Sequence, residues 1–342
     1  MTSVSIYDDM IAYGCEDGRV KIWNKTDDNL FLLKGSHSDR VWSVAFNHDG
    51  KKIASGGKDG IIKIWDVGTL TVIKDLTDDK SDVLSVAFNN NKIVSGSKNN
   101  KIKIWDLTTD VPIEVDEGHT ARVNSVRFSP DGTLFASGSQ DGTVKVWDSE
   151  TNSCLATVQG YNGENTRGVW SVAFSPDGKL LVSGSGGREA KDDKAAKDDK
   201  AAINACIRVW GLSIVDPSQP SSTESAASSP TPQATLTMAH EYVLLPGQSV
   251  HSVAFSPNGN MIAAGLHDNS VVVYDEKKNQ KFLKGHTNYT NSVAFFNDNV
   301  LVSGSQDGSV KTWDLSTSAP EGGSRKTKRN KKTKRKTKKN RK

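Results

Sequence analysis

The sequence of 342 residues contains no run of about 20 apolar residues, the length that a helix needs to cross a bilayer. Its first ten residues have neither the basic start nor the apolar stretch of a secretory signal. Only three cysteines are present, Cys15, Cys154 and Cys206, and they are far apart. These absences argue against a membrane span, an exported chain and a disulfide framework, so we expect an intracellular protein.

The sequence motifs of common enzymes are also missing. There is no GxSxG, no GxxxxGKS or GxxxxGKT, and no HExxH. His240 and Glu241 match the start of the last motif, but Leu244 stands where its second histidine belongs. We therefore predict that the chain is not an enzyme and that it needs no cofactor and no metal ion.

Positive and negative charges are unevenly distributed along the chain. Residues 325–342 contain 13 of the 44 lysines and arginines and no acidic residue. The remaining residues hold 31 basic side chains against 40 acidic ones, so an acidic body precedes a strongly basic tail.

One pattern recurs along the whole body of the chain. Copies such as VWSVAFNHDGKKIASGGKDGIIKIWD begin at Val41, Val83, Val123, Val169, Val250 and Thr290, and a shorter copy opens at Ser3. Each copy closes on an aromatic residue, and the seven are Trp23, Trp65, Trp105, Trp147, Trp210, Tyr274 and Trp313. The two longest intervals between these aromatics indicate insertions, at 187–206 and 214–234.

Each copy contains three short runs of alternating β-forming residues, divided by turn pairs such as Asp-Gly, and a weaker fourth run follows the aromatic. Four short strands cannot bury both faces of their own sheet. The units therefore have to stack side by side, and a closed ring protects most of the strand edges.

A repeat of this length that ends in Trp-Asp resembles the WD40 family. The resemblance implies an all-β, seven-bladed β-propeller over residues 1–320, and from its composition we expect the Lys/Arg-rich tail that follows, 321–342, to be disordered. It also implies a hydrogen-bonded structural tetrad of His, Ser, Asp and Trp within a blade. Three blades hold complete sets: His37, Ser55, Asp59 and Trp65; His119, Ser137, Asp141 and Trp147; and His286, Ser303, Asp307 and Trp313. We expect blades 2, 4 and 7 to be the stiffest.

The seventh copy lacks an obvious fourth strand, because only DLSTSAPEGG separates its tryptophan from the basic tail. The sequence therefore indicates either a blade of three strands or a truncated form of the chain, and we hypothesise that the exposed edge could accept a strand from a partner. A blunt and unused edge is an equal alternative.

The resemblance places partner binding on the top face of the ring, around the central channel. Residues beside the start of each first strand, or before the turn aspartate, should project there. They are Arg40, Trp42, Lys58, Lys98, Arg122, Asn124, Trp170, His251, His267, Tyr289 and Asn291. Tryptophan, tyrosine and arginine are enriched in binding hot spots, so we single out Trp42 and Trp170. Packing of these two tryptophans against neighbouring blades is the alternative.

The basic tail cannot fold alone, because its charges repel one another and it has no apolar residue to bury. It suits nucleic-acid phosphates or nuclear import, so we favour the nucleus or nucleolus if the source is eukaryotic and the cytoplasm otherwise. Its basic residues are Arg325, Lys326, Lys328, Arg329, Lys331, Lys332, Lys334, Arg335, Lys336, Lys338, Lys339, Arg341 and Lys342.

The sequence thus predicts a non-catalytic protein–protein interaction scaffold, a monomer within a larger complex, whose propeller binds a protein or peptide. The alternative is a nucleic-acid-associated factor in chromatin or ribosome biogenesis, with the tail as its main affinity element through non-specific nucleic-acid contacts. A ubiquitin-ligase substrate receptor is disfavoured, because the arginine that such relatives often carry three residues after the tryptophan is absent from this chain.

Overall fold

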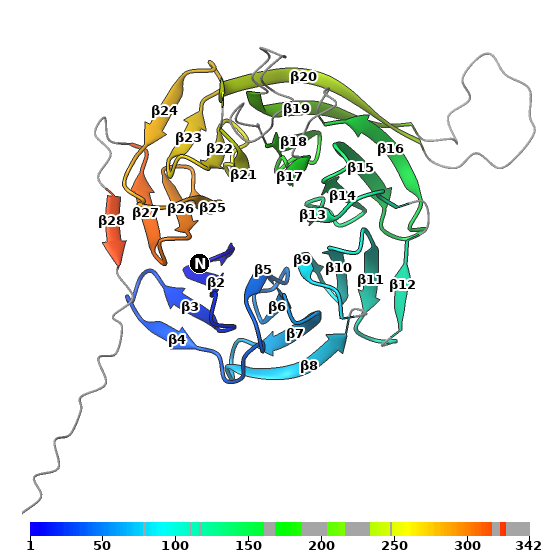
Figure 1. Cartoon of the computed structure of the whole chain (residues 1–342), viewed down its shortest axis with the longest axis vertical. Coiled ribbons are helices and arrows are strands. Elements are labelled where there is room, and N and C mark those ends of the chain that lie inside the picture. The colour runs from blue at the N-terminus through cyan, green and yellow to red at the C-terminus, as the bar shows by residue number, and fades with distance from the viewer. Residues whose placement is uncertain are drawn as a thin grey trace, which may run out of the picture.

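The computed structural model describes residues 1–77, 80–109, 111–115, 118–160, 168–186, 204–215, 233–246, 248–316 and 322–325. Its regular elements are all β-strands, which form seven four-stranded antiparallel sheets around a central channel (Figure 1). This confirms the predicted all-β, seven-bladed propeller.

Each blade is built from four consecutive strands, and the first strand lies nearest the channel (Figure 1). Blades 1 and 2 hold β1 (Val4–Tyr7), β2 (Met10–Gly14), β3 (Val20–Asn24), β4 (Leu30–Leu32), β5 (Val41–Phe46), β6 (Lys52–Gly57), β7 (Ile61–Asp66) and β8 (Thr71–Thr77). Blades 3 and 4 hold β9 (Val83–Asn89), β10 (Lys92–Ser97), β11 (Ile102–Asp106), β12 (Pro112–Glu114), β13 (Val123–Phe128), β14 (Leu134–Ser139), β15 (Thr143–Asp148) and β16 (Cys154–Gln159).

Blades 5 to 7 continue the series. They hold β17 (Val169–Phe174), β18 (Leu180–Ser185), β19 (Asn204–Val215), β20 (Gln233–Pro246), β21 (Val250–Phe255), β22 (Ile262–Leu266), β23 (Val271–Tyr274), β24 (Gln280–Leu283), β25 (Thr290–Asn297), β26 (Val300–Ser305), β27 (Val310–Asp314) and β28 (Gly322–Arg325). The central parts of the predicted insertions, 187–203 and 216–232, lie outside the described residues.

The interpretation of blade 7 as a three-stranded sheet is wrong. Strand β28 pairs antiparallel with β27, from Trp313 opposite Gly322 to Val310 opposite Arg325. Gly-Gly-Ser-Arg has no β-forming pattern, so the sequence does not indicate this strand, but a strand on a sheet edge needs only backbone hydrogen bonds. Strand β28 therefore occupies the edge of β27 at which a partner strand was expected, and becomes the outer strand of the blade.

The core lies between the blades rather than at a single centre. Seven clusters of buried apolar residues are present in the described chain, and each joins neighbouring blades, as where Val20 and Ile22 of blade 1 pack with Val41 and Trp65 of blade 2. This is the arrangement expected of repeats that cannot bury their own faces.

A glycine in the second strand allows neighbouring blades to approach closely. A Cβ atom on Gly56 would lie 2.6 Å from Cγ1 of Val83, and one on Gly184 would lie 2.4 Å from Cγ1 of Val250. Both separations are too short for real atoms, so any larger residue would push the blades apart.

A ring of serine hydroxyls joins the first strands of all seven blades. Each hydroxyl oxygen accepts a hydrogen bond of 3.0–3.3 Å from the valine amide of the next blade. We call Ser3, Ser43, Ser85, Ser125, Ser171, Ser252 and Ser292 the serine ring. Each of them is at least nine-tenths buried.

The interface that closes the ring, between blades 7 and 1, uses the same devices as the other six. The amide of Val4 donates to Oγ of Ser292 at 3.0 Å, and Met1 and Val4 pack with Val302 and Val310. Gly304 supplies the close approach here, because a Cβ atom on it would lie 2.9 Å from Cε of Met1. The ring therefore closes by packing and hydrogen bonding between complete blades.

The tetrads of blades 2, 4 and 7 form continuous hydrogen-bond chains inside their blades. In blade 7, Nε1 of Trp313 donates to Oγ of Ser303 at 2.7 Å, that hydroxyl lies 2.7 Å from Nε2 of His286, and Nδ1 of His286 lies 3.0 Å from Asp307. The chain is satisfied when a neutral histidine carries its proton on Nδ1, so that the serine donates to Nε2. Blades 2 and 4 repeat these contacts at 2.7–3.1 Å.

Burial and hydrogen bonding shift the pKa values of His37, His286 and Asp307. Burial lowers the pKa of His37 and of His286, although the neighbouring aspartates Asp59 and Asp307 oppose the shift. Burial alone would raise the pKa of Asp307, but hydrogen bonds, led by those from Ser309 and Thr287, lower it to about 2. The tetrad of blade 7 therefore holds a neutral histidine beside an ionised aspartate.

Blades 3 and 5 keep only the tryptophan–serine part of the chain. Nε1 of Trp105 donates to Oγ of Ser95, and Nε1 of Trp210 donates to Oγ of Ser183, both at 2.9 Å. Blade 6 has Ala264 in the serine position and Tyr274 in the tryptophan position. These blades lack the full network, so greater stiffness of blades 2, 4 and 7 stays our prediction.

The tetrad serine should matter more than its counterpart in a partial blade. Ser303→Ala leaves both the N–H of Trp313 and Nε2 of His286 without a buried partner, so we expect a loss of about 2–4 kcal/mol in the free energy of unfolding. Ser95→Ala leaves one group unpaired and should cost about 1–2 kcal/mol. Urea unfolding of the two variants tests this, and equal losses would contradict the role of the histidine.

Acid should destabilise the propeller in two steps. The folded pKa values of His37 and His286 lie below the ordinary value of 6.5, so the unfolded chain binds these two protons first as the pH falls. The free energy of unfolding therefore decreases below pH 6.5, and each histidine contributes up to about 1.4 kcal/mol per pH unit. Asp307 contributes stability that is present above its ordinary pKa of 3.8 and is lost as the pH falls toward 2.

Melting temperatures from pH 7.5 to 3 measure this dependence. Replacing both histidines by glutamine should flatten the curve between pH 6.5 and 5, because the two titrating groups are gone. An identical slope in the variant would show that other groups cause the first step.

Candidate functional site

A cavity of about 360 Å³ opens at one mouth of the central channel. Nine of the eleven residues predicted for the top face line it, namely Arg40, Trp42, Lys98, Arg122, Asn124, Trp170, His251, Tyr289 and Asn291. Lys58 and His267 do not line it. Lys58 pairs with Asp39 at 3.0 Å, and the ring of His267 stacks on Tyr289 with 3.7 Å between centroids.

A break in strand pairing aims the mouth residues at the channel. In blade 2, Val41 pairs with Gly57 and Ser43 with Gly56, which leaves Trp42 as an extra residue in a β-bulge. The same shift occurs in the first strands of blades 3 to 7, so that Trp170 and His251 occupy equivalent positions. A bulge reorients one side chain without disturbing the rest of the strand.

Two tryptophans dominate the apolar surface of the mouth, and each is covered by an arginine. Cζ of Arg40 lies 5.0 Å from the ring of Trp42, and Cζ of Arg122 lies 5.0 Å from the ring of Trp170. Both tryptophans are half-buried, and Nε1 of each is buried with no hydrogen-bond partner among the described residues. The buried tryptophans of the tetrads, by contrast, all use this donor.

The wall formed by blades 5 to 7 is aromatic. The ring of Trp170 lies 5.5 Å from that of His251, which is parallel to the rings of His267 and Tyr289. Nε2 of His251 is 3.1 Å from Nδ1 of His267, so one imidazole donates a hydrogen bond to the other. The stack presents a flat surface with polar edges, which suits recognition of planar or polar groups.

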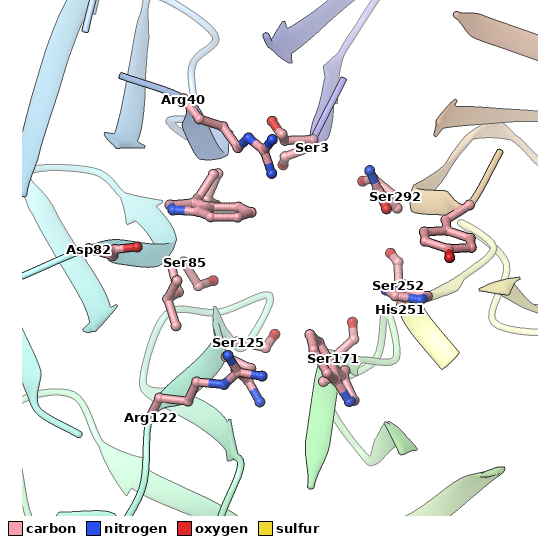
Figure 2. A pocket seen from close by; sticks show the side chains of 18 of the residues that line it. Ser3, Arg40, Asp82, Ser85, Arg122, Ser125, Ser171, His251, Ser252 and Ser292 are labelled. Carbon is pink, nitrogen blue, oxygen red and sulfur yellow. The ribbon is translucent and has the colours of Figure 1, made fainter. Parts of the chain in front are cut away.

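Charges at the mouth are mostly paired. Arg40 contacts Glu16 at 3.1 Å, and Lys98 lies 3.9 Å from Asp82. Nη2 of Arg122 donates to the side chain of Gln140 at 3.2 Å. Figure 2 shows Arg40, Asp82, Arg122 and His251 around the open centre of the channel.

Two of the predicted binding residues also connect blades. The side-chain amide of Asn124 donates to the carbonyl of Val169 at 2.8 Å, and that of Asn291 donates to the carbonyl of Met1 at 2.9 Å. Each bond crosses to the next blade, so these two asparagines support the ring as well as lining its mouth.

Sequence reasoning missed several cavity residues. Glu16, Asp82 and Gln306 also line the mouth, and so do the serine ring and Arg127. The sequence carried a signal for Arg127, because it stands where five of the seven copies have alanine. Of the thirteen basic residues in the tail, only Arg325 has a described backbone, in β28. The other twelve lie outside the described part.

The His–Ser–Asp sets cannot work as hydrolytic triads. Ser55, Ser137 and Ser303 are fully buried, and each Oγ is already bonded to a tryptophan and a histidine. A nucleophile must reach its substrate beside an oxyanion hole. In the described residues no three His, Cys, Asp or Glu side chains gather as metal ligands, and no helix is long and apolar enough to cross a membrane.

Known proteins resemble parts of this chain. The human F-box-like/WD repeat-containing protein TBL1X is 28% identical over 126 residues, which cover 36% of this chain and 22% of that protein. The U3 small nucleolar RNA-associated protein 4 of Saccharomyces cerevisiae is 36% identical over 87 residues, 22% of this chain and 11% of its own length. The chain thus matches less than a quarter of each relative.

A solved structure matches almost the whole ring. A chain in the crystal structure of a mitotic checkpoint complex superimposes with a TM-score of 0.71, covering 92% of this chain and 86% of that one, at 20% identity. At this identity the likeness shows the fold alone. The model of the WD domain, G-beta repeat, matches residues 29–66, 70–106, 111–148, 152–193, 238–275 and 277–314. These six repeats span more than half of the sequence, so the chain belongs to the WD40 family.

Proposed function

We propose that this chain is a non-catalytic scaffold that binds a protein or peptide partner at the channel mouth. The observation that carries the proposal is the pair Trp42 and Trp170, which face the cavity half-buried, each with an unpaired N–H and an arginine against its ring. Buried polar groups normally have partners, and desolvated tryptophan–arginine clusters are typical of binding hot spots.

Family membership supports the same function. WD40 propellers are typically interaction scaffolds, and neither the two relatives nor the structural match carries the name of an enzyme. A protein partner accounts for the apolar and aromatic wall of blades 5 to 7, because a nucleic acid alone would favour a continuous basic surface. The chain then acts as a monomer within a larger complex.

The basic tail supports a second role, in localisation or contact with polyanions. Thirteen basic residues without an acidic one in 325–342 suit phosphates, and one relative is named for its association with small nucleolar RNA. We place the protein in the nucleus or nucleolus on this basis if its source is eukaryotic. In the alternative function, as a nucleic-acid-associated factor, the tail is the main affinity element.

Capture of partners by the full chain and by residues 1–327 separates the two functions. The shorter chain keeps β28 intact and removes eleven of the thirteen basic residues. If the propeller recognises the partner, the same proteins should remain on both chains after nuclease treatment and at high salt. Replacing Trp42 and Trp170 by alanine should weaken that binding at least tenfold, as hot-spot residues do. Loss of all binding on nuclease treatment or tail removal would instead favour the nucleic-acid factor.

The mouth tryptophans should contribute little to folding. Nε1 of Trp170 makes no hydrogen bond within the described part of the chain, so Trp170→Phe should lower the free energy of unfolding by less than about 1 kcal/mol. Trp147→Phe is the matched control, since it removes the fully buried N–H that donates to Ser137 at 2.8 Å, and it should cost about 2–4 kcal/mol. Urea unfolding measures both. A large loss for Trp170→Phe would assign this residue to packing between blades.

A further inference from the structure

Arg127 breaks the regularity of the channel lining. In each blade a valine, here called the ring valine, follows the residue of the serine ring. The residue after this valine faces a second cavity of about 530 Å³ farther along the channel. This residue is alanine in five blades, Ser5 in blade 1 and Arg127 in blade 4. Arg127 lines both cavities, so its side chain lies where they meet.

Among the described residues, one nitrogen of the Arg127 guanidinium donates hydrogen bonds. Nη1 donates to the carbonyl of Val126 at 2.7 Å and to Oγ of Ser85 at 3.4 Å. Nε and Nη2 donate to no atom in the described parts of the chain. These two atoms form the side of a guanidinium that binds a planar carboxylate through two parallel hydrogen bonds.

No carboxylate in the described chain neutralises Arg127. Two acidic residues line the cavity at the channel mouth, and both pair with other groups: Glu16 contacts Arg40 at 3.1 Å, and Asp82 lies 3.9 Å from Lys98. The second cavity is lined by no acidic residue among those described. Burial lowers the pKa of Arg127, which reflects the cost of holding its charge there.

The serine ring adds hydrogen-bond donors to the cavity that Arg127 also lines, and Oγ of Ser85 lies 3.4 Å from its Nη1. Each ring hydroxyl is fixed by the valine amide from which it accepts, and none donates to an acceptor among the described residues. Figure 2 shows Ser85, Ser125, Ser171 and Ser252 around the open channel. Their O–H groups are free to donate to a group that enters it.

We propose that the central channel is an anion site in which a carboxylate binds to Nε and Nη2 of Arg127 and accepts hydrogen bonds from the serine ring. An unpaired cation and a set of fixed hydroxyl donors are both complementary to an oxyanion, and a neutral or cationic ligand would leave the arginine uncompensated. The six other blades show that the propeller needs only a small residue at this position.

The carboxylate can come from a free small dicarboxylate or from an acidic side chain of a partner bound at the mouth. Only the second source rests on the proposed function. Titration with a small molecule does not, so the anion site and the scaffold function can fail separately.

Calorimetric titration of the full chain with succinate tests the site. Succinamide is the uncharged control ligand. The basic tail also binds anions, so the decisive quantity is the difference between variants that share this tail. Arg127→Ala should lower the association constant of the channel site at least tenfold. Arg127→Lys keeps the charge but lacks the two-nitrogen edge, and should lower it about threefold or more. Arg19→Ala, an equal change of charge at an exposed pair with Asp17, should leave it unchanged.

Thermal unfolding without added anions gives a second measure that does not depend on binding. Arg127→Ala restores the residue found in five other blades and removes an uncompensated charge, so its melting temperature should equal or exceed that of the unchanged protein. Succinate binding within twofold of the unchanged protein in either Arg127 variant would overturn the proposal. So would a lower melting temperature for Arg127→Ala, which would make the arginine a structural residue.

A competition experiment identifies the source of the carboxylate. If Arg127→Ala also releases a captured partner, or succinate displaces it from the unchanged protein, the partner supplies the group. If the partner stays bound while succinate binding is lost, a free small carboxylate is the ligand. Both results support the anion site.

Discussion

Seven times around the ring, a serine hydroxyl on the first strand of one blade accepts a hydrogen bond from a valine amide of the next. The first strand is the inner edge of its sheet, and an edge strand has amides that no neighbouring strand can pair. Serine is short enough to reach such an amide while the blades stay in contact. The bond therefore sets the spacing at which the glycines fit and the apolar clusters between the blades close.

The same bond explains how the ring closes. Because the contact between Ser292 and Val4 repeats those at the other six interfaces, the last blade treats the first as its ordinary neighbour. Each blade is complete in itself, since β28 supplies the outer strand of blade 7. Stability then depends on seven similar interfaces, and we expect the full tetrads to add stiffness within blades 2, 4 and 7.

A framework held in this way leaves the mouth of the channel free to vary. The bulges in the first strands of blades 2 to 7 carry different residues: Asn124 and Asn291 bond to the next blade, whereas blades 2, 5 and 6 have tryptophan, tryptophan and histidine there. Arg127 lies one strand position beyond the ring valine and departs from the framework's own pattern. A residue that departs from the repeat at a position where the other blades agree is a candidate for ligand binding.

The repeat by itself determined the number of blades, the inner strands, the tetrads and most of the mouth residues, because each depends on local pattern within a unit of about 40 residues. The tertiary structure alone decided the rest. Strand β28 has the sequence Gly-Gly-Ser-Arg, which does not indicate a strand, because backbone pairing on a sheet edge needs no particular side chain. His267 turned to stack on Tyr289, and Lys58 toward Asp39, through contacts with other segments. The surroundings of Arg127, where no carboxylate of the described residues pairs with it, depend on seven separate strands that meet around one channel, since a cavity belongs to no single repeat.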